Sequence, residues 1–451
     1  MTDHRLESAP AGAIAALVSR RNGPALRLEK FGYSLADQVL STGGMFVVNV
    51  ALARVRSKEE YGVFALSYSI FTFLAGLHNA ATLEAYTIYG SGRYRERFSK
   101  YAPLVARANA GVASGLTALL VLIWLGLHRL RPVLASPALL GMGLGCGGML
   151  WAAFRRRTFY IRRQAERAFA FSAAFFLSCL VMLALAIRAG LLNGWSAFVI
   201  TALAWLIAGG LIGSERTEHA GIAGDFLREE PGYWREHWRY SRWVLVTALV
   251  FQFTTQAYFW VVAGFVSLKE VAELRAIYNL ALPVDQGFTA ITLLVLPQMA
   301  GHFAAREPGK LRQLWLECTG AFLLLSSGFA LMVGAGSLPL LHFVYNGKFD
   351  GVAPLLRWYV LLPVVMGVGN ASNAALKAME RPQTVFYAYL ASGATTLLAG
   401  IPLVARMGLR GAVYGMLVSA TSYASVLALG CYRISRRQAA PGETVPAAEM
   451  V

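Results

Sequence analysis

Three ionisable residues that could carry a proton or an ion, Asp37, Glu84 and Arg107, lie within long apolar stretches. A charge in hydrocarbon costs several kcal/mol, so each needs a partner, a wet cavity or the interface. Measured from the membrane face where the first and third stretches begin and the second ends, all three lie about 9 Å deep. We therefore expect one cluster with Arg107 between the two carboxylates. It would be either a structural ion pair or a proton- or cation-coupling site.

A second polar group surrounds Asp285, which we place about 13 Å into its own helix. It follows Pro283, whose missing N–H loosens a helix, and precedes Gln286. Gln252 and Gln256 lie midway along the preceding apolar stretch. These groups could line a cavity wall, or they could form an interhelical hydrogen-bond network.

Asn370 and Asn373 share one helical face and are weaker candidates for the same wall. We find no phosphate-binding glycine loop, nucleophile triad or metal cluster, and so expect no cofactor and no metal. The four cysteines lack pairing or ligand spacing and are predicted to be buried hydrophobic residues (Cys146, Cys179, Cys318 and Cys431).

The elements that position these residues must be membrane helices. The chain is 57% hydrophobic and only 14% charged, whereas a soluble protein carries about a quarter charged residues. Twelve apolar stretches are each long enough to cross a bilayer, and only helices satisfy their backbone there. They lie near 31–53, 62–89, 101–127, 133–154, 168–188, 195–213, 241–264, 276–301, 313–338, 354–376, 384–405 and 410–432.

The distribution of basic residues predicts the orientation. The net charge is +17, and most Lys and Arg residues fall in the tails and in alternate loops. The loop expected after the fourth span is especially rich (Arg155, Arg156, Arg157, Arg162, Arg163 and Arg167). The positive-inside rule then places both termini in the cytoplasm, with the charge facing anionic lipids rather than nucleic acid. The first apolar stretch, 11–18, is too short for a signal peptide.

A repeated pattern indicates two related halves. Residues 53–70 align with residues 263–280 at an offset of 210, and both contain Ser-x-x-Glu before an apolar helix. This pattern is typical of a capping box. Because six spans separate the copies, the repeats are parallel. We predict an all-α integral membrane protein with two six-helix lobes related by a pseudo-twofold axis.

The predicted division is a cytoplasmic tail (1–30), an N-lobe (31–213), a linker (214–240), a C-lobe (241–432) and a second tail (433–451). In the linker, Trp234 and Trp238 are spaced i, i+4 beside Arg235, Arg239 and Arg242. This spacing favours an amphipathic helix in the cytoplasmic interface.

The opening YSLADQVLSTGGMFVVNVALARVRSKEEYG resembles that of Wzx-type polysaccharide flippases in the multidrug/oligosaccharidyl-lipid/polysaccharide (MOP) exporter superfamily. ALKAMERPQTVFYAYLASG and GLRGAVYGMLVSA resemble a later part of the same family. The resemblance implies two lobes around a central cavity in the bacterial inner membrane. It also implies movement of an undecaprenyl-pyrophosphate-linked oligosaccharide between leaflets by alternating access, with proton or sodium coupling and polysaccharide-assembly proteins as possible partners.

Two other classes stay open. Drug/cation antiporters of this superfamily follow the first helix with an aspartate and a glycine-rich turn, whereas this chain has Ala51-Leu52-Ala53-Arg54. A polymerase or ligase would need a large external loop, and the longest, 340–353, is short. We therefore favour a transporter over an enzyme, with a cation-coupled multidrug antiporter as the alternative.

The pyrophosphate of such a substrate needs cations that can bind it bidentately, which arginine does better than lysine. Arg54 and Arg56 follow the first span, and Arg275 precedes the eighth. We expect these three to receive the diphosphate at the outer mouth, although each could instead be a surface residue.

Overall fold

The computed structural model describes residues 24–130, 136–213, 230 and 232–439, and within them the regular structure is helical. The first-lobe helices are α2 (Pro24–Val55), α3 (Lys58–His78), η1 (Asn79–Leu83), α4 (Glu84–Ser91), α5 (Phe98–Leu130), α6 (Pro137–Ile161), α7 (Ala165–Arg188) and α8 (Gly194–Ile212). The second-lobe helices are α10 (Tyr233–Phe265), α11 (Leu268–Ala304), α12 (Pro308–Ala335), α13 (Ser337–Tyr345), η3 (Asp350–Val352), α14 (Ala353–Tyr359), α15 (Leu361–Ala378), α16 (Pro382–Thr395), η4 (Thr396–Gly400) and α17 (Ile401–Ala439).

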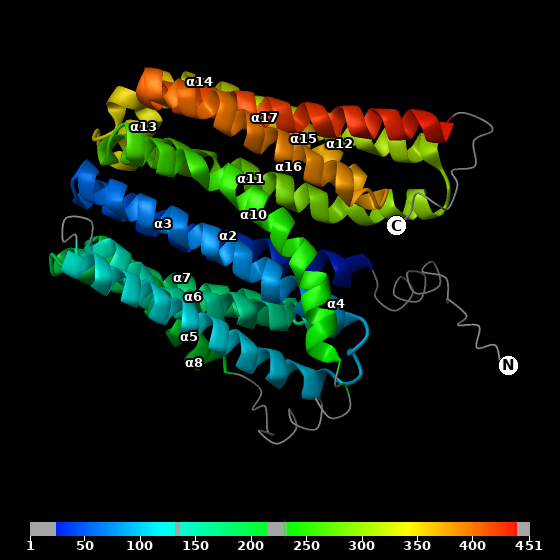
Figure 1. Ribbon diagram of the computed structural model, residues 1–451, viewed down its shortest axis with the longest axis horizontal. Helices are drawn as coiled ribbons and strands as arrows, with labels where there is room; N and C mark the ends of the chain where they lie inside the picture. The colour runs from blue at the N-terminus through cyan, green and yellow to red at the C-terminus, as the bar shows by residue number, and fades with distance from the viewer. Residues whose placement is uncertain (1–23, 131–135, 214–229, 231, 440–451) are drawn as a thin grey trace.

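The helices form two elongated bundles that lie side by side (Figure 1). Helices α2 to α8 make the blue-to-teal bundle, and α11 to α17 make the green-to-red one. Helix α10 contacts both bundles, and α3 packs against α10 and α11 along the seam. We call the end where α2 begins and α17 ends the tail end. The opposite end, where α2 ends and α3 begins, is the closed end.

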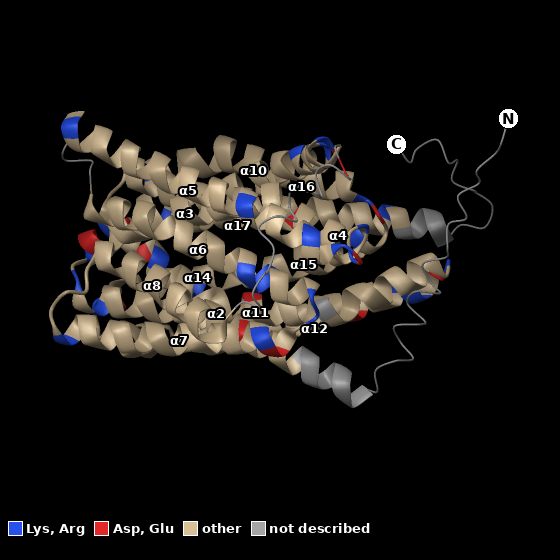
Figure 2. Cartoon of the chain, turned by 90° about the horizontal axis from the view of Figure 1, so that it is seen from below, with Lys and Arg blue, Asp and Glu red and all other residues tan. Residues whose placement is uncertain are grey.

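Twelve membrane crossings fit the described residues. Eleven helical stretches are long and apolar enough to span a bilayer, and the last, Pro382–Ile434, is 53 residues long. It is interrupted at Gly408, whose φ of 59° departs from helical geometry, and the segments on either side of this point pack together. The last stretch is therefore two spans, and the predicted all-helical membrane fold is confirmed. Figure 2 shows charged residues at both ends of the bundle and also in its middle part.

The two Ser-x-x-Glu patterns begin equivalent helices. Ser57 Oγ accepts from the Glu60 N–H at the start of α3, and Ser267 Oγ accepts from the Glu270 N–H at the start of α11, both at 3.2 Å. Each serine satisfies a donor that the first helical turn leaves unpaired. The serine half of each predicted capping box is therefore present, and it marks corresponding places in the two lobes.

The predicted linker is only partly described. Residues 214–229 and 231, and the tails at 1–23 and 440–451, lie outside the described residues. From Tyr233 the chain forms the first turns of α10, continuous with the seventh span rather than a separate interfacial helix. His237 Nε2 and Ser241 Oγ lie 3.0 Å and 2.9 Å from the Ala81 carbonyl oxygen, which ties α10 to the first lobe.

Candidate functional site

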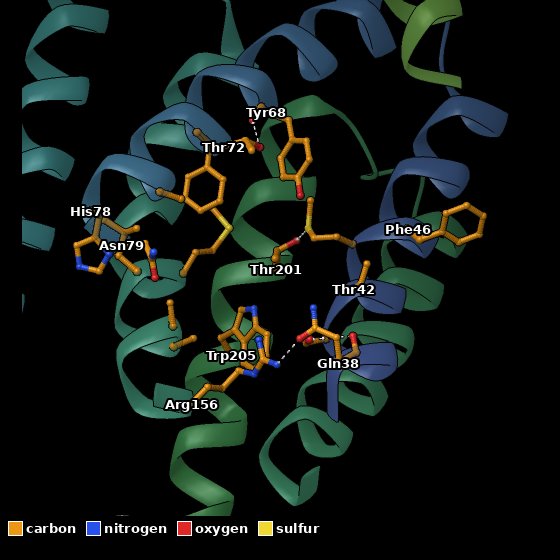
Figure 3. A pocket seen from close by; sticks show the side chains of 18 of the residues that line it. Gln38, Thr42, Phe46, Tyr68, Thr72, His78, Asn79, Arg156, Thr201 and Trp205 are labelled. Carbon is orange, nitrogen blue, oxygen red and sulfur yellow. Dashed lines mark hydrogen bonds between the residues drawn. The ribbon is translucent and has the colours of Figure 1, made fainter. Parts of the chain in front are cut away.

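A cavity of about 800 Å³ opens among α2, α3, α6, α8, α10 and α11 (Figure 3). Most of its wall comes from the first lobe, and α10 and α11 close it on the other side. Its polar and charged lining residues are Ser34, Gln38, Ser41, Thr42, Asn49, Tyr68, Thr72, His78, Asn79, Arg156, Arg157, Tyr160, Thr201, Gln256, Arg275, Tyr278 and Thr289. Its volume is in the upper part of the usual range for small-molecule sites, about 300–1,000 Å³.

The cavity wall is basic. Its charged lining residues are Arg156, Arg157 and Arg275, and no Asp or Glu is among the residues that line it. The exposed residue Asp285 lies on the face of α11 that carries the lining residues Leu282 and Thr289, so one carboxylate borders the cavity. Arg156 is paired with the buried Asp37, so two guanidinium groups without a carboxylate partner face one bordering carboxylate. This balance favours an anionic ligand over a cationic one.

Asp37 is fully buried and is the acceptor for three side chains from neighbouring helices. Arg156 of α6 donates to both carboxylate oxygens, at 3.2 Å and 2.6 Å. Tyr160 of α6 and Ser172 of α7 donate at 2.6 Å and 2.5 Å. Asp37 therefore neutralises one cavity arginine and joins α2, α6 and α7.

The predicted triad of Asp37, Glu84 and Arg107 is wrong. The partner of Asp37 is Arg156, and Glu84 accepts a hydrogen bond from Tyr240 of α10 at 3.3 Å. Arg107 is exposed on α5 and forms an ion pair with neither carboxylate. Equal depth placed the three residues at one level, but depth does not specify which helix face each one occupies.

Arg157 is held at the cavity wall by a turn of unusual geometry. Its Nη2 donates to Asn79 Oδ1 at 3.0 Å, and Asn79 begins the π-helical turn η1 that interrupts the helix between α3 and α4. Such turns occur mostly as single bulges and are frequent at functional sites. No other hydrogen bond or ion pair to Arg157 occurs in the described residues, so most of its donors stay available to a ligand.

Arg275 lies deeper and is only 5% exposed. Its guanidinium lies 4.5 Å from the ring centre of Tyr68 and 5.0 Å from that of Tyr278. Its Nε donates to Asn49 Oδ1 of α2 at 3.3 Å. Tyr68 and Tyr278 are matching positions of the two repeats, so one arginine makes cation–π contacts with both equivalent tyrosines. Arg275 has no carboxylate partner in the described part of the chain, and cation–π contacts compensate part of the cost of burial.

Arg275 is therefore not at the outer mouth, where the sequence placed it. Helix α11 begins at Leu268, seven residues before Arg275, and seven residues amount to about 10 Å of helix. The apolar stretch appeared to begin at 276, because hydropathy excludes charged residues from a span. The Ser267 cap was the better marker of where the helix starts.

The predicted glutamines separate into different environments. Gln256 lines the cavity, and its buried Oε1 has no hydrogen-bond partner. Gln252 instead packs over Gly76 of α3, at the seam between the lobes. Gln286 is half-buried beside Asp285 and does not line the cavity, and its Oε1 is also without a partner.

The two asparagines on α15 do not reach the cavity. Asn373 donates to Tyr423 Oη of α17 at 3.1 Å, and Asn370 is half-buried on the same helix. Neither residue is part of the cavity lining. Their position supports packing of α15 against α17 rather than contact with a ligand in this cavity.

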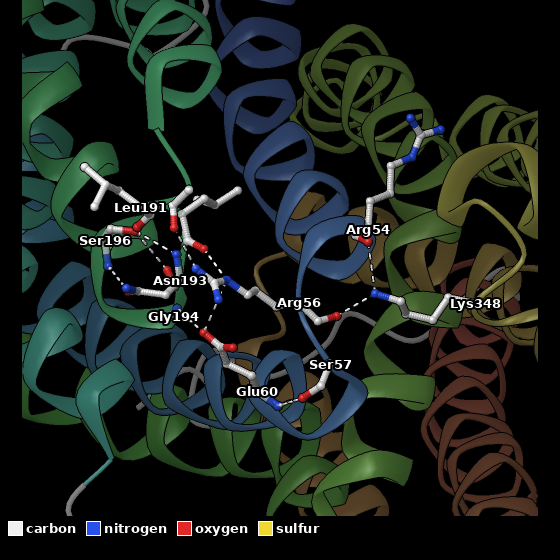
Figure 4. A network of polar contacts seen from close by, with 11 residues as sticks. Arg54, Arg56, Ser57, Glu60, Leu191, Asn193, Gly194, Ser196 and Lys348 are labelled. Carbon is white, nitrogen blue, oxygen red and sulfur yellow. Dashed lines mark hydrogen bonds and ion pairs between the residues drawn. The ribbon is translucent and has the colours of Figure 1, made fainter. Parts of the chain in front are cut away.

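Arg54 and Arg56 lie at the closed end and bind backbone oxygens (Figure 4). Arg54 donates to the carbonyls of Val344 and Phe343 in α13. Arg56 donates to Leu192 O at 2.5 Å and to Gly190 O at 3.1 Å. In this conformation the two arginines fasten the end of α2 to neighbouring segments, outside the cavity.

Lys348 closes the same region from the second lobe. Its Nζ donates to the carbonyls of Ala53 and Arg54 at 2.9 Å and to that of Arg56 at 2.5 Å. The last carbonyls of a helix have no partner within it, and a cation there also complements the helix dipole. Lys348 therefore acts as a cap that the second lobe places on the first.

The starts of α3 and α11 meet at this closed end. A Cβ added to Gly62 would lie 1.9 Å from the Leu268 carbonyl oxygen, so the backbones are in direct contact. Two ion pairs flank this crossing, Lys58–Glu273 at 2.6 Å and Lys269–Glu59 at 3.0 Å. The lobes are thus sealed at the closed end, and the cavity lies on the tail-end side of the seal.

Solved transporters have the same fold. An inward-facing multidrug resistance MATE family transporter of the MOP superfamily superposes with a TM-score of 0.72 at 14% identity, covering 89% of this chain and 95% of that one. An outward-facing one superposes with a TM-score of 0.62 at 12% identity, covering 96% and 99%. The fold is that of a MATE transporter of the MOP superfamily.

A third structure is a MOP superfamily transporter from Pyrococcus furiosus whose description reports reverse polarity of the binding pocket. It superposes with a TM-score of 0.66 at 12% identity, covering 96% of this chain and 99% of that one. No protein-family model and no curated protein matches the sequence. At these identities the likeness shows the fold alone, so any substrate has to be inferred from the cavity.

Sequence reasoning missed two basic residues that line the cavity near its tail-end side. Arg156 and Arg157 were placed in a loop, because the fourth span was ended at the first arginine. Helix α6 continues to Ile161. Within it, Arg156 pairs with the Asp37 carboxylate and Arg157 donates to the Asn79 side chain. A usable signal existed, since residues 155–161 contain no turn-forming Gly or Pro.

Proposed function

We propose that this protein moves a polyprenyl-diphosphate-linked oligosaccharide across the bacterial inner membrane by alternating access. The observation that carries the proposal is the basic lining of the cavity, with Arg156, Arg157 and Arg275 in its wall and no lining carboxylate. A membrane cavity that accepts an anionic head group needs such a lining, because an unpaired charge of either sign is costly there. The MOP fold supplies two lobes that can open alternately.

Arg156 and Arg157 are suited to the diphosphate. They lie four to five residues from the tail-end terminus of α6, which is about 6–8 Å along the helix. The proposed cytoplasmic position of the tail end puts this level near the lipid head groups. A diphosphate could then reach Arg157 while the polyprenyl chain stays in lipid. Arg54 and Arg56 would contact the substrate only after the closed end opens.

The wall also offers surfaces for sugars. Tyr68, Phe71 and Trp205 contribute aromatic rings, and Gln38 and Thr201 contribute polar groups. Figure 3 shows Thr201 between Tyr68 and Trp205. Apolar and aromatic walls with a few placed polar groups are usual for small-molecule sites. This combination suits a saccharide, whose rings present both C–H faces and hydroxyl groups.

A cation-coupled multidrug antiporter is the second candidate. It is favoured by the MATE fold and by Asp285, an exposed carboxylate beside the cavity that could hold a proton or a cation. In the flippase proposal Asp285 is a coupling group, since transport against a gradient needs an ion or proton to drive it. With Arg156 paired to Asp37, the remaining cavity arginines, Arg157 and Arg275, still outnumber Asp285, which makes the cavity a poor site for a cationic drug.

Deleting the gene and analysing the lipids would separate these candidates. The flippase proposal expects lipid-linked oligosaccharide to accumulate in the cytoplasmic leaflet, and a plasmid copy carrying Arg157→Gln should restore export poorly. Arg155→Gln is a matched control, because Arg155 bonds to Gly213 O and does not line the cavity. Normal lipid intermediates together with hypersensitivity to cationic drugs would support the antiporter instead.

A further inference from the structure

The cavity holds two cationic sites at different depths. Contacts at the closed end set a common level for the helices: Gly194 N lies 3.4 Å from Glu60 Oε1, and a Cβ on Gly194 would lie 2.9 Å from Ala138 Cβ. Gly62 likewise contacts Leu268. The starts of α3, α6, α8 and α11 therefore lie at one level, from which depth along the helices can be counted.

The two guanidinium groups are held apart by different asparagines. Arg157 and its acceptor Asn79 are 20 and 21 residues from the closed-end starts of their helices, or about 30 Å. Arg275 and its acceptor Asn49 are seven and six residues from the closed-end termini of theirs, or about 10 Å. The two sites are thus separated by about 20 Å along the bundle. In Figure 3, Tyr68, which stacks on Arg275, and Arg156 lie at opposite ends of the pocket.

One diphosphate cannot occupy both sites, because its two phosphorus atoms share a single bridging oxygen. If the diphosphate binds at Arg157, whose donors are mostly available, Arg275 lies ahead of it, where the saccharide must project. The two Nη groups of Arg275 make no hydrogen bond within the described residues, and only its Nε is used. Two parallel N–H donors are the arrangement that binds a carboxylate or a phosphate bidentately.

We infer that the saccharide itself carries an anionic group, and that Arg275 recognises it. The substrate class is thereby narrowed to acidic oligosaccharides, in which a carboxylate or a phosphate substituent lies several sugar units from the diphosphate. Tyr68 and Tyr278 hold the guanidinium plane in place before the ligand arrives, which lowers the entropy lost on binding. This inference rests on the proposed function and deepens it.

Binding of three synthetic polyprenyl diphosphates to the purified full-length protein tests the inference. They carry the same trisaccharide with a neutral, a glucuronate or a phosphorylated terminal sugar. We expect the wild type to bind one or both acidic compounds about tenfold more tightly than the neutral one, a difference of about 1.4 kcal/mol. The preferred compound identifies the anionic group as carboxylate or phosphate.

The variants separate recognition of the sugar from recognition of the diphosphate. Arg275→Gln should abolish the preference and leave affinity for the neutral compound within twofold of wild type. Arg157→Gln should lower the affinity for all three compounds by the same factor, and Arg155→Gln should leave all three affinities unchanged. Equal wild-type affinity for the three compounds, or equal weakening of all three by Arg275→Gln, would overturn the inference while leaving the proposed function intact. Failure of the wild type to bind any of them would overturn the proposed function itself.

Discussion

Glu60 and Glu270 occupy matching positions in the two lobes, and each contacts the N–H at the start of the sixth helix of its own lobe. Glu60 Oε1 accepts from Gly194 at 3.4 Å, and Glu270 Oε2 accepts from Leu409 at 2.8 Å. Both carboxylates therefore cap the start of a neighbouring helix. The predicted capping box instead had each glutamate accept from an N–H at the start of its own helix. The duplicated unit thus extends to tertiary contacts, which supports a common origin for the two lobes.

The buried pair of Asp37 and Arg156 should matter for stability. Removing one partner of a buried ion pair leaves an uncompensated charge and typically costs about 3–5 kcal/mol. Because the Arg156 side chain left behind is 21% exposed, we expect Asp37→Ala to lower the unfolding free energy in detergent by about 3 kcal/mol, the lower end of that range. Glu84→Gln is the control, because Glu84 has one hydroxyl partner at 3.3 Å and should change stability little. Equal stability of both variants and the wild type would show that the Asp37 network is not structural.

The contact between Gly62 and Leu268 should control closure. A methyl group at Gly62 meets the Leu268 backbone oxygen, which cannot move aside without shifting α11. Overpacking of this kind costs about 1–3 kcal/mol, so Gly62→Ala should reduce the population sealed at this end about tenfold. Electron–electron distances between spin labels at the exposed residues Val55 and Leu338 would report it. Gly115→Ala, with open space around it, is the matched control, and identical distance distributions would contradict the prediction.

The ion pair between Lys58 and Glu273 should contribute modestly to the same seal. The side chains are 28% and 19% exposed, and pairs with partial solvent contact are worth about 0.2–1 kcal/mol. Lys58→Glu should therefore favour separation of the lobes by up to about fivefold. The double variant Lys58→Glu/Glu273→Lys should restore closure in the same distance measurement. A swap that behaves like the single variant would show that the pair does not couple the lobes.

Lys348 should make closure depend on pH. Burial, with Lys58 nearby, lowers the pKa of Lys348 below its ordinary value of 10.5. Opening the closed end would expose the amine and return its pKa toward that value. Between the lowered pKa and 10.5, the closed state binds fewer protons than the open state. A rise in pH across this window therefore favours closure, whereas below the window closure does not depend on the protonation of Lys348. Lys348→Met should remove this dependence, and a wild-type closure that weakens as pH rises through the window would refute the assignment.

The sequence predicted best those features that depend on residues within a single helix. Hydropathy located the twelve spans, and the serine caps located the starts of α3 and α11. Asp37 has an arginine partner, but that partner is Arg156 and not the predicted Arg107. Which side chains pair between helices depends on how each helix is rotated about its own axis. The depth of a residue in the membrane does not give that rotation.

The cavity itself was the least predictable part. Arg156 and Arg157 were assigned to a loop because a span was assumed to stop at its first charge. Arg275 was assigned to the outer mouth for the same reason. In both cases a side chain on another helix, Asp37, Asn79 or Asn49, accepts from the arginine and so helps to hold it within the bundle. Such compensation exists only in the folded bundle, so one sequence could not reveal it.

Affinity of the purified protein for polyprenyl diphosphate and for lipophilic organic cations tests the central claim most directly. A cavity lined by three arginines should bind the diphosphate and lose at least tenfold in affinity in Arg157→Gln, and it should bind the cations weakly in both proteins. Tight binding of the cations, with no measurable binding of the diphosphate to the wild type, would contradict the account.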